Sequence, residues 1–434
     1  MKCLKIACLI AIVACSAFSA FAQGLPAASK PEEVGFSSER LSRIRTAFQA
    51  EVDKGVIPGA VILVARRGKV AYFEAIGFQN RENKKDMKPD AIFRIASMSK
   101  PLASVAVMML VEDGKIQLLD PVSRYLPEIK NLQVGVEKSN DATGSRELVL
   151  EPAQREMTIQ DLLRHTSSLT YGIFGKSLVK QAYLAANLFD GNQTLAEFVS
   201  KIAKLPLAHQ PGSTWDYSHS TDVLGRVAEV VSGQSFDQFI AERITKSLGL
   251  SDTGFYVPQE QVARLAEPQI DPTTGKRWPM ADVTSRPNYL SGGAGMVSTA
   301  SDYARFAQML LNGGVLGGTR LLSPKTIEFM TSDHLWPGIA FSPTTLDLLE
   351  PLGIAPTPRT GQSFGLGFMI RTETGRNQMP GSSGSFYWVG IWGTAFWIDP
   401  KEQLVAVLMM QATPTQARYY RSVVRNVVYQ AMID

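Results

Sequence analysis

The stretch AIFRIASMSKPLASVAVMMLVEDGK, residues 91–115, decides how this chain is interpreted. Ser97 follows a β-like apolar run and precedes a strongly apolar segment that is typical of a helix ending at Gly114. Near a helix N-terminus, unpaired backbone N–H groups and the positive end of the helix dipole favour an oxyanion. Lys100 lies one helical turn further along, so its ammonium can reach the Ser97 hydroxyl. Because a serine needs a neighbour to take its proton, this pair predicts a nucleophile.

A second Ser-x-x-Lys pattern, Ser177 to Lys180, lies in the segment FGKSLVKQAYLAAN. A chain of this length contains roughly two such patterns by chance. No strand-like run precedes Ser177, and Lys176 and Lys180 fit a solvated helical face. We therefore expect Ser97 to be catalytic and Ser177 to be structural.

The first 22 residues, MKCLKIACLIAIVACSAFSAFA, are typical of a secretory signal peptide. Lysines come first, an apolar run follows, and a small-x-small site predicts cleavage after Ala22 and a periplasmic or secreted protein. Two alternatives stay open. One is a membrane anchor, which the serines in the tail of the segment disfavour. The other is a lipoprotein, in which Cys15 would be lipidated; only in that case do we expect the membrane as a partner.

Composition excludes several classes of function. The 434 residues are 45% apolar and 19% charged, which indicates a globular protein long enough for two domains. A net charge of +4 without a basic stripe argues against nucleic acid as a partner. Cys3, Cys8 and Cys15 all lie in the leader, so the mature chain has no disulfide and no thiol nucleophile. The four histidines lack zinc-hydrolase spacing, and we expect no metal and no cofactor.

The pattern of elements predicts an α+β fold. Residues 37–55 have helical periodicity, and residues 60–77 are two β-rich runs around Arg67-Gly68, which indicates a hairpin. Residues 393–411 repeat the hairpin pattern, and a helix is expected at about 414–432. These features predict one antiparallel sheet, built from both ends of the chain and covered by the terminal helices.

The middle of the chain is helical by periodicity, so we expect an inserted domain. The predicted division is a sheet domain formed by residues 23–95 and 296–434, and a mostly helical domain formed by residues 96–295. The active site is expected between them. The polar or proline-rich segments 139–157 and 335–362 are expected to be loops, the second a rim around the site.

Three motifs in order resemble the serine β-lactamase and penicillin-binding fold. They are FRIASMSKP at 93–101, GSTWDYSHS at 212–220 and GSFYWVGIWGTAFWIDP at 384–400. More closely, the chain is similar to the esterase branch, the family VIII carboxylesterases that resemble class C β-lactamases. The phrases DPVSRYLP and LLRHTSSLTYG, and GGAGMVSTASDYARFAQMLLNGG further along, support the same resemblance, which runs from about Gly35 to the C-terminus.

The resemblance implies a role for each motif. Ser97 would form an acyl-enzyme, and Lys100 and Tyr217 would share the proton transfers, since a nearby ammonium favours tyrosinate. The backbone N–H groups of Ser97 and Ile391 would form the oxyanion hole. Gly390 would let the strand approach the substrate closely.

Two departures from the penicillin-recognising pattern bear on the substrate. The second motif has His219 where an asparagine is usual, and the strand has Trp388-Val389-Gly390 where Lys-Thr-Gly is usual. Both changes remove polar contacts to a β-lactam or a peptide carboxylate, so Trp388 and Gly390 are expected to bind an uncharged acyl group. His219 either contacts the substrate or is hydrogen-bonded within its loop, and the second interpretation is favoured.

The leading hypothesis is an exported serine hydrolase that cleaves small carboxylic esters. The same chemistry leaves a β-lactamase, a D-amino-acid peptidase or an acyltransferase open, with a small-molecule ester or amide as the partner. A different class, a non-catalytic binding or scaffold relative, is disfavoured because Ser97, Lys100 and Tyr217 are all present. The sequence leaves the oligomeric state open.

Overall fold

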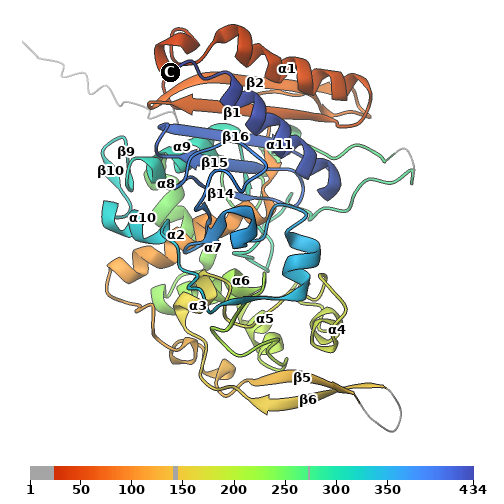
Figure 1. The fold of residues 1–434 in the computed structure, drawn as a ribbon. Helices are drawn as coiled ribbons and strands as arrows, with labels where there is room; N and C mark the ends of the chain where they lie inside the picture. Colours follow the sequence, from red (N-terminus) through yellow and green to blue (C-terminus); the bar gives the residue numbers. More distant parts are fainter. Residues whose placement is uncertain (1–23, 140–144, 272–273) are drawn as a thin grey trace, which may run out of the picture.

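The computed structural model describes residues 24–139, 145–271 and 274–434 of the chain. The predicted leader, with Cys15 and the cleavage site after Ala22, lies outside the described residues. A large antiparallel sheet and a group of helices below it form an α+β fold, which confirms the predicted fold class (Figure 1). No helix in the described part of the chain combines the length and the apolar character needed to cross a membrane.

The central sheet has eight strands in the order β12-β13-β14-β15-β16-β1-β2-β3, with every neighbouring pair antiparallel. The two ends of the chain meet at its centre, where Ala60 pairs with Met410. The predicted hairpin is present, and its turn residues Arg67 and Gly68 both have positive φ. The strands are β1 (Gly59–Arg66), β2 (Lys69–Asn80), β3 (Lys85–Asp86), β12 (Gln362–Phe364), β13 (Met369–Arg371), β14 (Phe386–Val389), β15 (Ala395–Asp399) and β16 (Leu404–Met410).

Helices cover both faces of this sheet. The terminal helices α1 (Ser38–Asp53) and α11 (Pro414–Gln430) lie together on one face, where the rings of Phe48 and Tyr420 are 5.6 Å apart. Ser37 caps α1, and Thr413 forms a capping box at α11, so both helices begin where side-chain oxygens satisfy free N–H groups. Helix α9 (Ala300–Leu311) contacts β1, β15 and β16.

Helix α2 (Ser99–Glu112) links the sheet to the helices below it. Residues 99–110 of α2 are all buried, which is why its sequence is apolar on every side. It packs on α6 (Ser220–Ser232), the helix that follows the Tyr217 motif. The remaining helices are α3 (Ile159–Leu163), α4 (Leu178–Ala185), α5 (Leu195–Ile202), α7 (Phe236–Ile240), α8 (Lys246–Leu248) and α10 (Pro324–Met330).

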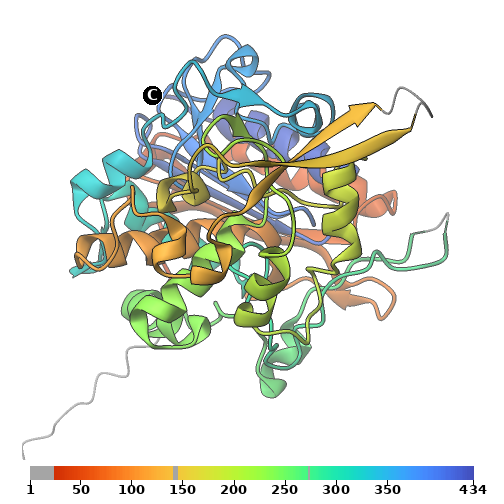
Figure 2. The same cartoon turned by 90° about the horizontal axis from the view of Figure 1, so that it is seen from below.

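Four small sheets complete the fold. They pair β4 (Phe93–Arg94) with β8 (Val297–Ser298), β5 (Gln133–Ser139) with β6 (Arg146–Pro152), β7 (Thr214–Trp215) with β11 (Ala340–Phe341), and β9 (Val315–Leu316) with β10 (Thr319–Arg320). The β5–β6 pair projects from the body as an arm (Figure 2).

The expectation of a loop over 139–157 is wrong, because β6 lies within it. The charged residues of β6 obscure the alternation that would predict a strand. In the structure they form ion pairs with residues of β5: Glu151 with Lys138 at 3.1 Å and Arg146 with Glu137 at 2.8 Å. Segment 335–362 is mostly irregular, as expected, but its strand β11 pairs with β7. This pairing places the segment beside the strand that leads into Tyr217.

Candidate active site

Ser97 lies in the short 3-10 turn Ala96–Met98 that leads directly into α2. Its predecessor, Ala96, has a φ of +45°, a left-handed conformation that is strained for a residue with a Cβ atom. The Ser99 hydroxyl holds this turn: it donates to the Ala96 carbonyl at 2.7 Å and accepts from the Met296 N–H at 3.0 Å. Ser97 is half-buried while its neighbours are buried, so the turn presents its hydroxyl outward.

The Lys100 ammonium is buried and has three acceptors. It donates to Ser97 Oγ at 3.4 Å, to the Tyr171 hydroxyl at 3.2 Å and to the Gly293 carbonyl at 2.8 Å. The predicted contact between Ser97 and Lys100 is therefore present in the structure. The distance of 3.4 Å is long for a hydrogen bond.

Two tyrosines border Lys100. Its Nζ lies 4.6 Å from the ring centre of Tyr217 and 5.5 Å from that of Tyr171. Within the described residues, no hydrogen bond joins Lys100 to the Tyr217 hydroxyl. Burial raises the pKa of Tyr171 well above its usual range, so this phenol stays neutral and serves as a hydrogen-bond partner for the ammonium. Tyr217 therefore contacts Lys100 with its ring, whereas Tyr171 contacts Lys100 with its hydroxyl.

A buried carboxylate supports the Gly293 carbonyl that Lys100 contacts. Asp222 on α6 accepts from Ser291 Oγ at 2.5 Å and from the Gly293 N–H at 3.0 Å, and it lies 3.1 Å from His219 Nδ1. Burial tends to raise the pKa of Asp222, but the hydrogen bond from His219 and the charge of Lys100 leave it below its usual value. The carboxylate therefore stays ionised and fixes the loop that holds Lys100.

His219 is buried beside the site, not open to solvent. Its ring lies 4.3 Å from that of Tyr171 and 4.9 Å from that of Phe189, and burial lowers its pKa. The bond to Asp222 is the local hydrogen bonding that we favoured for this histidine. A substrate group that reached Tyr171 would also come near the His219 ring.

The end of β14 lies against the serine turn. A Cβ on Gly390 would overlap the Ile95 carbonyl, two residues before Ser97, so only glycine allows this approach. Ile391 is next in the chain and is 37% exposed, which leaves it at the mouth of the site. Trp388 packs 5.5 Å from the ring of Tyr217, and its buried Nε1 has no hydrogen-bond partner in the described part of the chain.

Ser177 lies outside this group. It is the N-cap of α4, accepting from the Lys180 N–H at 3.2 Å, which is the structural role that we expected. The expectation of a solvated Lys180 is wrong, since the ammonium is buried and lies 3.5 Å from Asp216. The carboxylate partner comes from the second motif, so only the tertiary fold could reveal it.

Sequence reasoning missed three members of the site. None of the roles assigned from the sequence falls on Tyr171, Asp222 or Gly293. The position of Tyr171 in LLRHTSSLTYG, one of the family phrases, was an available signal. Gly293 lies in GGAGMVSTASDYARFAQMLLNGG, another of the family phrases, whereas no local pattern marks Asp222. No cluster of three or more possible metal-ligating side chains occurs among the described residues.

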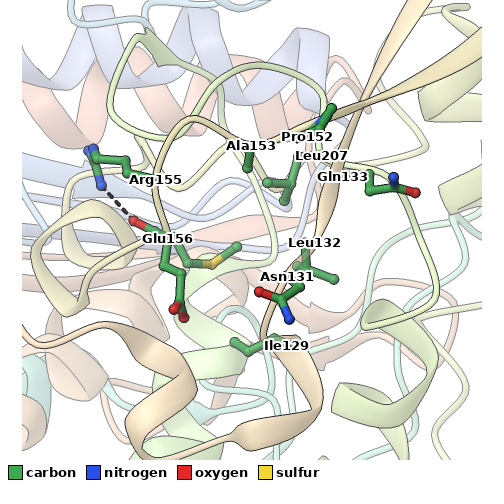
Figure 3. A pocket seen from close by; sticks show the side chains of 10 residues that line it. Ile129, Asn131, Leu132, Gln133, Pro152, Ala153, Arg155, Glu156 and Leu207 are labelled. Carbon is green, nitrogen blue, oxygen red and sulfur yellow. Dashed lines mark hydrogen bonds between the residues drawn. The ribbon is translucent and has the colours of Figure 1, made fainter.

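Three exposed apolar side chains follow Tyr171 in the helical region. Ile173, Leu184 and Phe189 are 50%, 60% and 49% exposed, and Phe189 stacks on Tyr171 with ring centres 5.8 Å apart. Adjacent apolar side chains of this kind are typical of a binding surface. A separate cavity of about 530 Å³ lies at the base of the arm, and none of the candidate residues lines it (Figure 3).

Comparison with known proteins identifies similar sequences and a family. A family profile described as Beta-lactamase matches residues 44–429. Protein Rv1367c of Mycobacterium tuberculosis is 33% identical over 368 residues, which cover 83% of this chain and 88% of that protein. Esterase EstB of Burkholderia gladioli is 29% identical over 393 residues, which cover 85% of this chain and 89% of that protein.

A solved structure shares the fold at similar coverage. EstCE1, described as a hydrolase with promiscuous acyltransferase activity, superimposes with a TM-score of 0.73 at 27% identity. The match covers 92% of this chain and 99% of that one.

Proposed function

This chain belongs to the beta-lactamase family, in its serine-hydrolase esterase branch, and we propose that it hydrolyses small carboxylic esters through an acyl-enzyme on Ser97. The observation that carries the proposal is the geometry of one turn. Ser97 Oγ lies at the start of α2, within 3.4 Å of a buried ammonium. A hydroxyl in this position has both a proton partner and nearby backbone donors.

The proposed reaction uses the residues around that turn. Ser97 Oγ bonds to the ester carbonyl carbon while its proton passes to the Tyr217 oxygen, which acts as the base of the pair while Lys100 remains an ammonium. The N–H groups of Ser97 and Ile391 stabilise the oxyanion. Cleavage of the C–O bond releases the alcohol, which takes the proton. Water then bonds to the acyl carbon, its proton passes through the same groups to Ser97 Oγ, and cleavage of the bond between Ser97 Oγ and the acyl carbon releases the carboxylic acid.

The surroundings of Ser97 favour an uncharged, apolar acyl group. Trp388 takes the place of the lysine that penicillin-recognising relatives use for a carboxylate. Near the entrance, Ile173 and Phe189 add apolar surface. A site without matching polar groups gives a carboxylate no compensation for lost hydration. We therefore rank short-chain esters above penicillins and D-amino-acid peptides.

Acyl transfer is a second candidate activity. The observation that favours it is the description of EstCE1 as a hydrolase with promiscuous acyltransferase activity. An acyl-enzyme can pass its acyl group to an alcohol instead of water, and the exposed apolar side chains near Phe189 would attract an apolar alcohol. Adding a primary alcohol to the esterase assay would produce the exchanged ester if this activity exists.

Export is part of the proposal. The composition of residues 1–22 supports a signal peptide cleaved after Ala22, which would place the mature enzyme in the periplasm or outside the cell. Mass analysis of protein from the producing cells should then find Gln23 as the first residue. A lipid-modified Cys15 would instead establish a membrane-anchored lipoprotein.

Covalent labelling tests the catalytic proposal. A fluorophosphonate should add its mass to the tryptic peptide that contains Ser97, and Ser97→Ala should abolish both the labelling and the hydrolysis of p-nitrophenyl butyrate. Ser177→Ala is the matched control, because Ser177 has the same sequence spacing to a lysine. Labelling that survives in Ser97→Ala would reject the assignment. A cephalosporin kcat/KM above that for the butyrate would reject the substrate class.

A further inference from the structure

Arg371 on β13 has an unusual pattern of hydrogen bonds. The side chain is 1% exposed, and its Nη1 donates to the carbonyls of Met379 and Gly381 at 2.8 and 3.0 Å. Within the described residues, its Nε and Nη2 have no partner. These two atoms form one edge of the guanidinium, the edge that binds anions with two parallel N–H bonds. A buried donor on a charged group without an acceptor is destabilising.

A second buried guanidinium lies beside it. Arg425 on α11 is 3% exposed and donates to the Pro380 carbonyl at 2.9 Å and to Ser385 Oγ at 3.4 Å. A Cβ on Gly381 would lie 2.8 Å from Arg425 Nη2 and 3.1 Å from Arg371 Nη1, so the two groups meet at one glycine. Burial and the charge of Arg425 lower the pKa of Arg371 to about 10, so the Arg371 guanidinium remains cationic at neutral pH.

The nearby carboxylate does not neutralise this pair. Asp399 is fully buried, and its oxygens accept from the Tyr429 hydroxyl at 2.6 Å and the Ser382 N–H at 2.9 Å. In the described ranges, neither Arg371 nor Arg425 forms an ion pair with any carboxylate. Arg371 and Arg425 are therefore two buried guanidinium groups near a single carboxylate, Asp399, and neither forms an ion pair with it. Buried charges are normally paired with an opposite charge.

Aromatic side chains limit the size of any ligand. The rings of Tyr387, Trp397 and Tyr429 lie 5.4, 5.5 and 5.9 Å from Arg425 Cζ, and Trp397 Nε1 is a further buried donor without a partner among the described residues. Ser385, Tyr387 and Trp397 are all less than 5% exposed. Because these buried side chains surround the two guanidinium groups, any ligand here must be small.

We propose that a monoatomic anion of the halide class, chloride under native conditions, binds at the Nε–Nη2 edge of Arg371 on β13. This site is separate from the proposed esterase chemistry and does not depend on it. The anion supplies the missing acceptor for Arg371 and balances the charge of Arg425. Arg425 itself joins the last helix to the start of the β14 segment through its bond to Ser385 Oγ.

Bromide is the probe, because it replaces chloride and scatters anomalously. Crystals of the mature protein transferred to sodium bromide should show an anomalous peak beside Arg371 Nε and Nη2. The matched control is Arg66, a buried arginine whose guanidinium nitrogens all have oxygen partners, where no peak is expected. Only water beside Arg371, with no bromide signal, would overturn the proposal.

Thermal melts separate a real site from an adventitious ion only. At constant ionic strength, replacing gluconate with chloride or bromide should raise Tm by about 2 °C for each tenfold increase above Kd. Arg371→Lys keeps the charge and loses the two-donor edge, so this variant should lose both the bromide peak and the halide response. A bromide peak together with identical melts in gluconate and halide would mean an adventitious ion only and would refute the proposal. If Arg371→Lys does not fold, the wild-type map and melts decide.

Discussion

Replacing Gly390 with alanine tests the placement of β14 against the nucleophile. The new Cβ would meet the Ile95 carbonyl and Thr394 Oγ1, roughly 1 Å inside an ordinary C···O contact of about 3.3 Å. Neither group can turn away freely, because Thr394 Oγ1 donates to the Ile95 carbonyl at 3.1 Å. The strand must therefore move away from the serine turn, and it carries the Ile391 N–H with it.

The size of the effect follows from this displacement. Overpacking by one methyl group should cost about 1–3 kcal/mol of folding free energy. A shift of about 1 Å at a catalytic group costs on the order of 100-fold in rate. Because the Ile391 N–H would act on the oxyanion of the transition state, kcat should fall and KM should change little.

The assay is steady-state and single-turnover hydrolysis of p-nitrophenyl butyrate, with a thermal melt of each protein. Gly375→Ala is the matched control, since a Cβ there meets no atom within 4 Å and Gly375 lies in an exposed loop. The control should behave like the wild type. A folded Gly390→Ala enzyme whose kcat is within threefold of the wild type would refute the proposed oxyanion strand.

Three further predictions concern stability. Lys180→Met should destabilise the fold by about 3–5 kcal/mol, because it leaves the buried Asp216 carboxylate without its lysine partner and with only His209 and two hydroxyls beside it, whereas Lys176→Met on the exposed surface should leave Tm unchanged. Burial raises the pKa of Asp302 to about 6, above its unfolded value of about 3.9. The protonated Asp302 carboxyl therefore makes its full contribution to folding stability below pH 4, and this contribution is lost as the pH rises through 6. Asp302→Asn should therefore gain up to about 3 kcal/mol relative to the wild type between pH 4 and 7, and parallel unfolding curves for the two proteins would contradict this. Ser177→Ala should cost about 1 kcal/mol as a lost helix cap, seen in denaturant unfolding, with full esterase activity; lost activity in a folded variant would contradict a purely structural role.

Local patterns predicted the elements that depend on local physics. The period of residues 38–53 and the cap at Ser37 identify α1, and the Arg67-Gly68 turn identifies the β1–β2 hairpin. The β6 strand was missed because its charged residues are stabilised by partners on β5, and a single-strand pattern contains no information about them.

Lys180 illustrates the same limit in the helical region. At the level of sequence it lies on a short helix with a second lysine nearby, which favours a solvated face. In the fold, Asp216 lies beside it and makes burial of the ammonium tolerable. The burial of a charged side chain is decided by its partner, and this partner is 36 positions away.

The sequence by itself determined that Ser97 and Lys100 would meet, because a spacing of three residues on a helix places two side chains on one face. It also determined the antiparallel sheet formed from both ends of the chain. Only the tertiary structure decided which groups surround the ammonium: the Tyr171 hydroxyl, 71 positions away, and the Gly293 carbonyl, 193 positions away. These contacts depend on how α2, α6 and the loops between them pack. Packing between residues so far apart in the sequence produces no periodic pattern from which the contacts could be predicted.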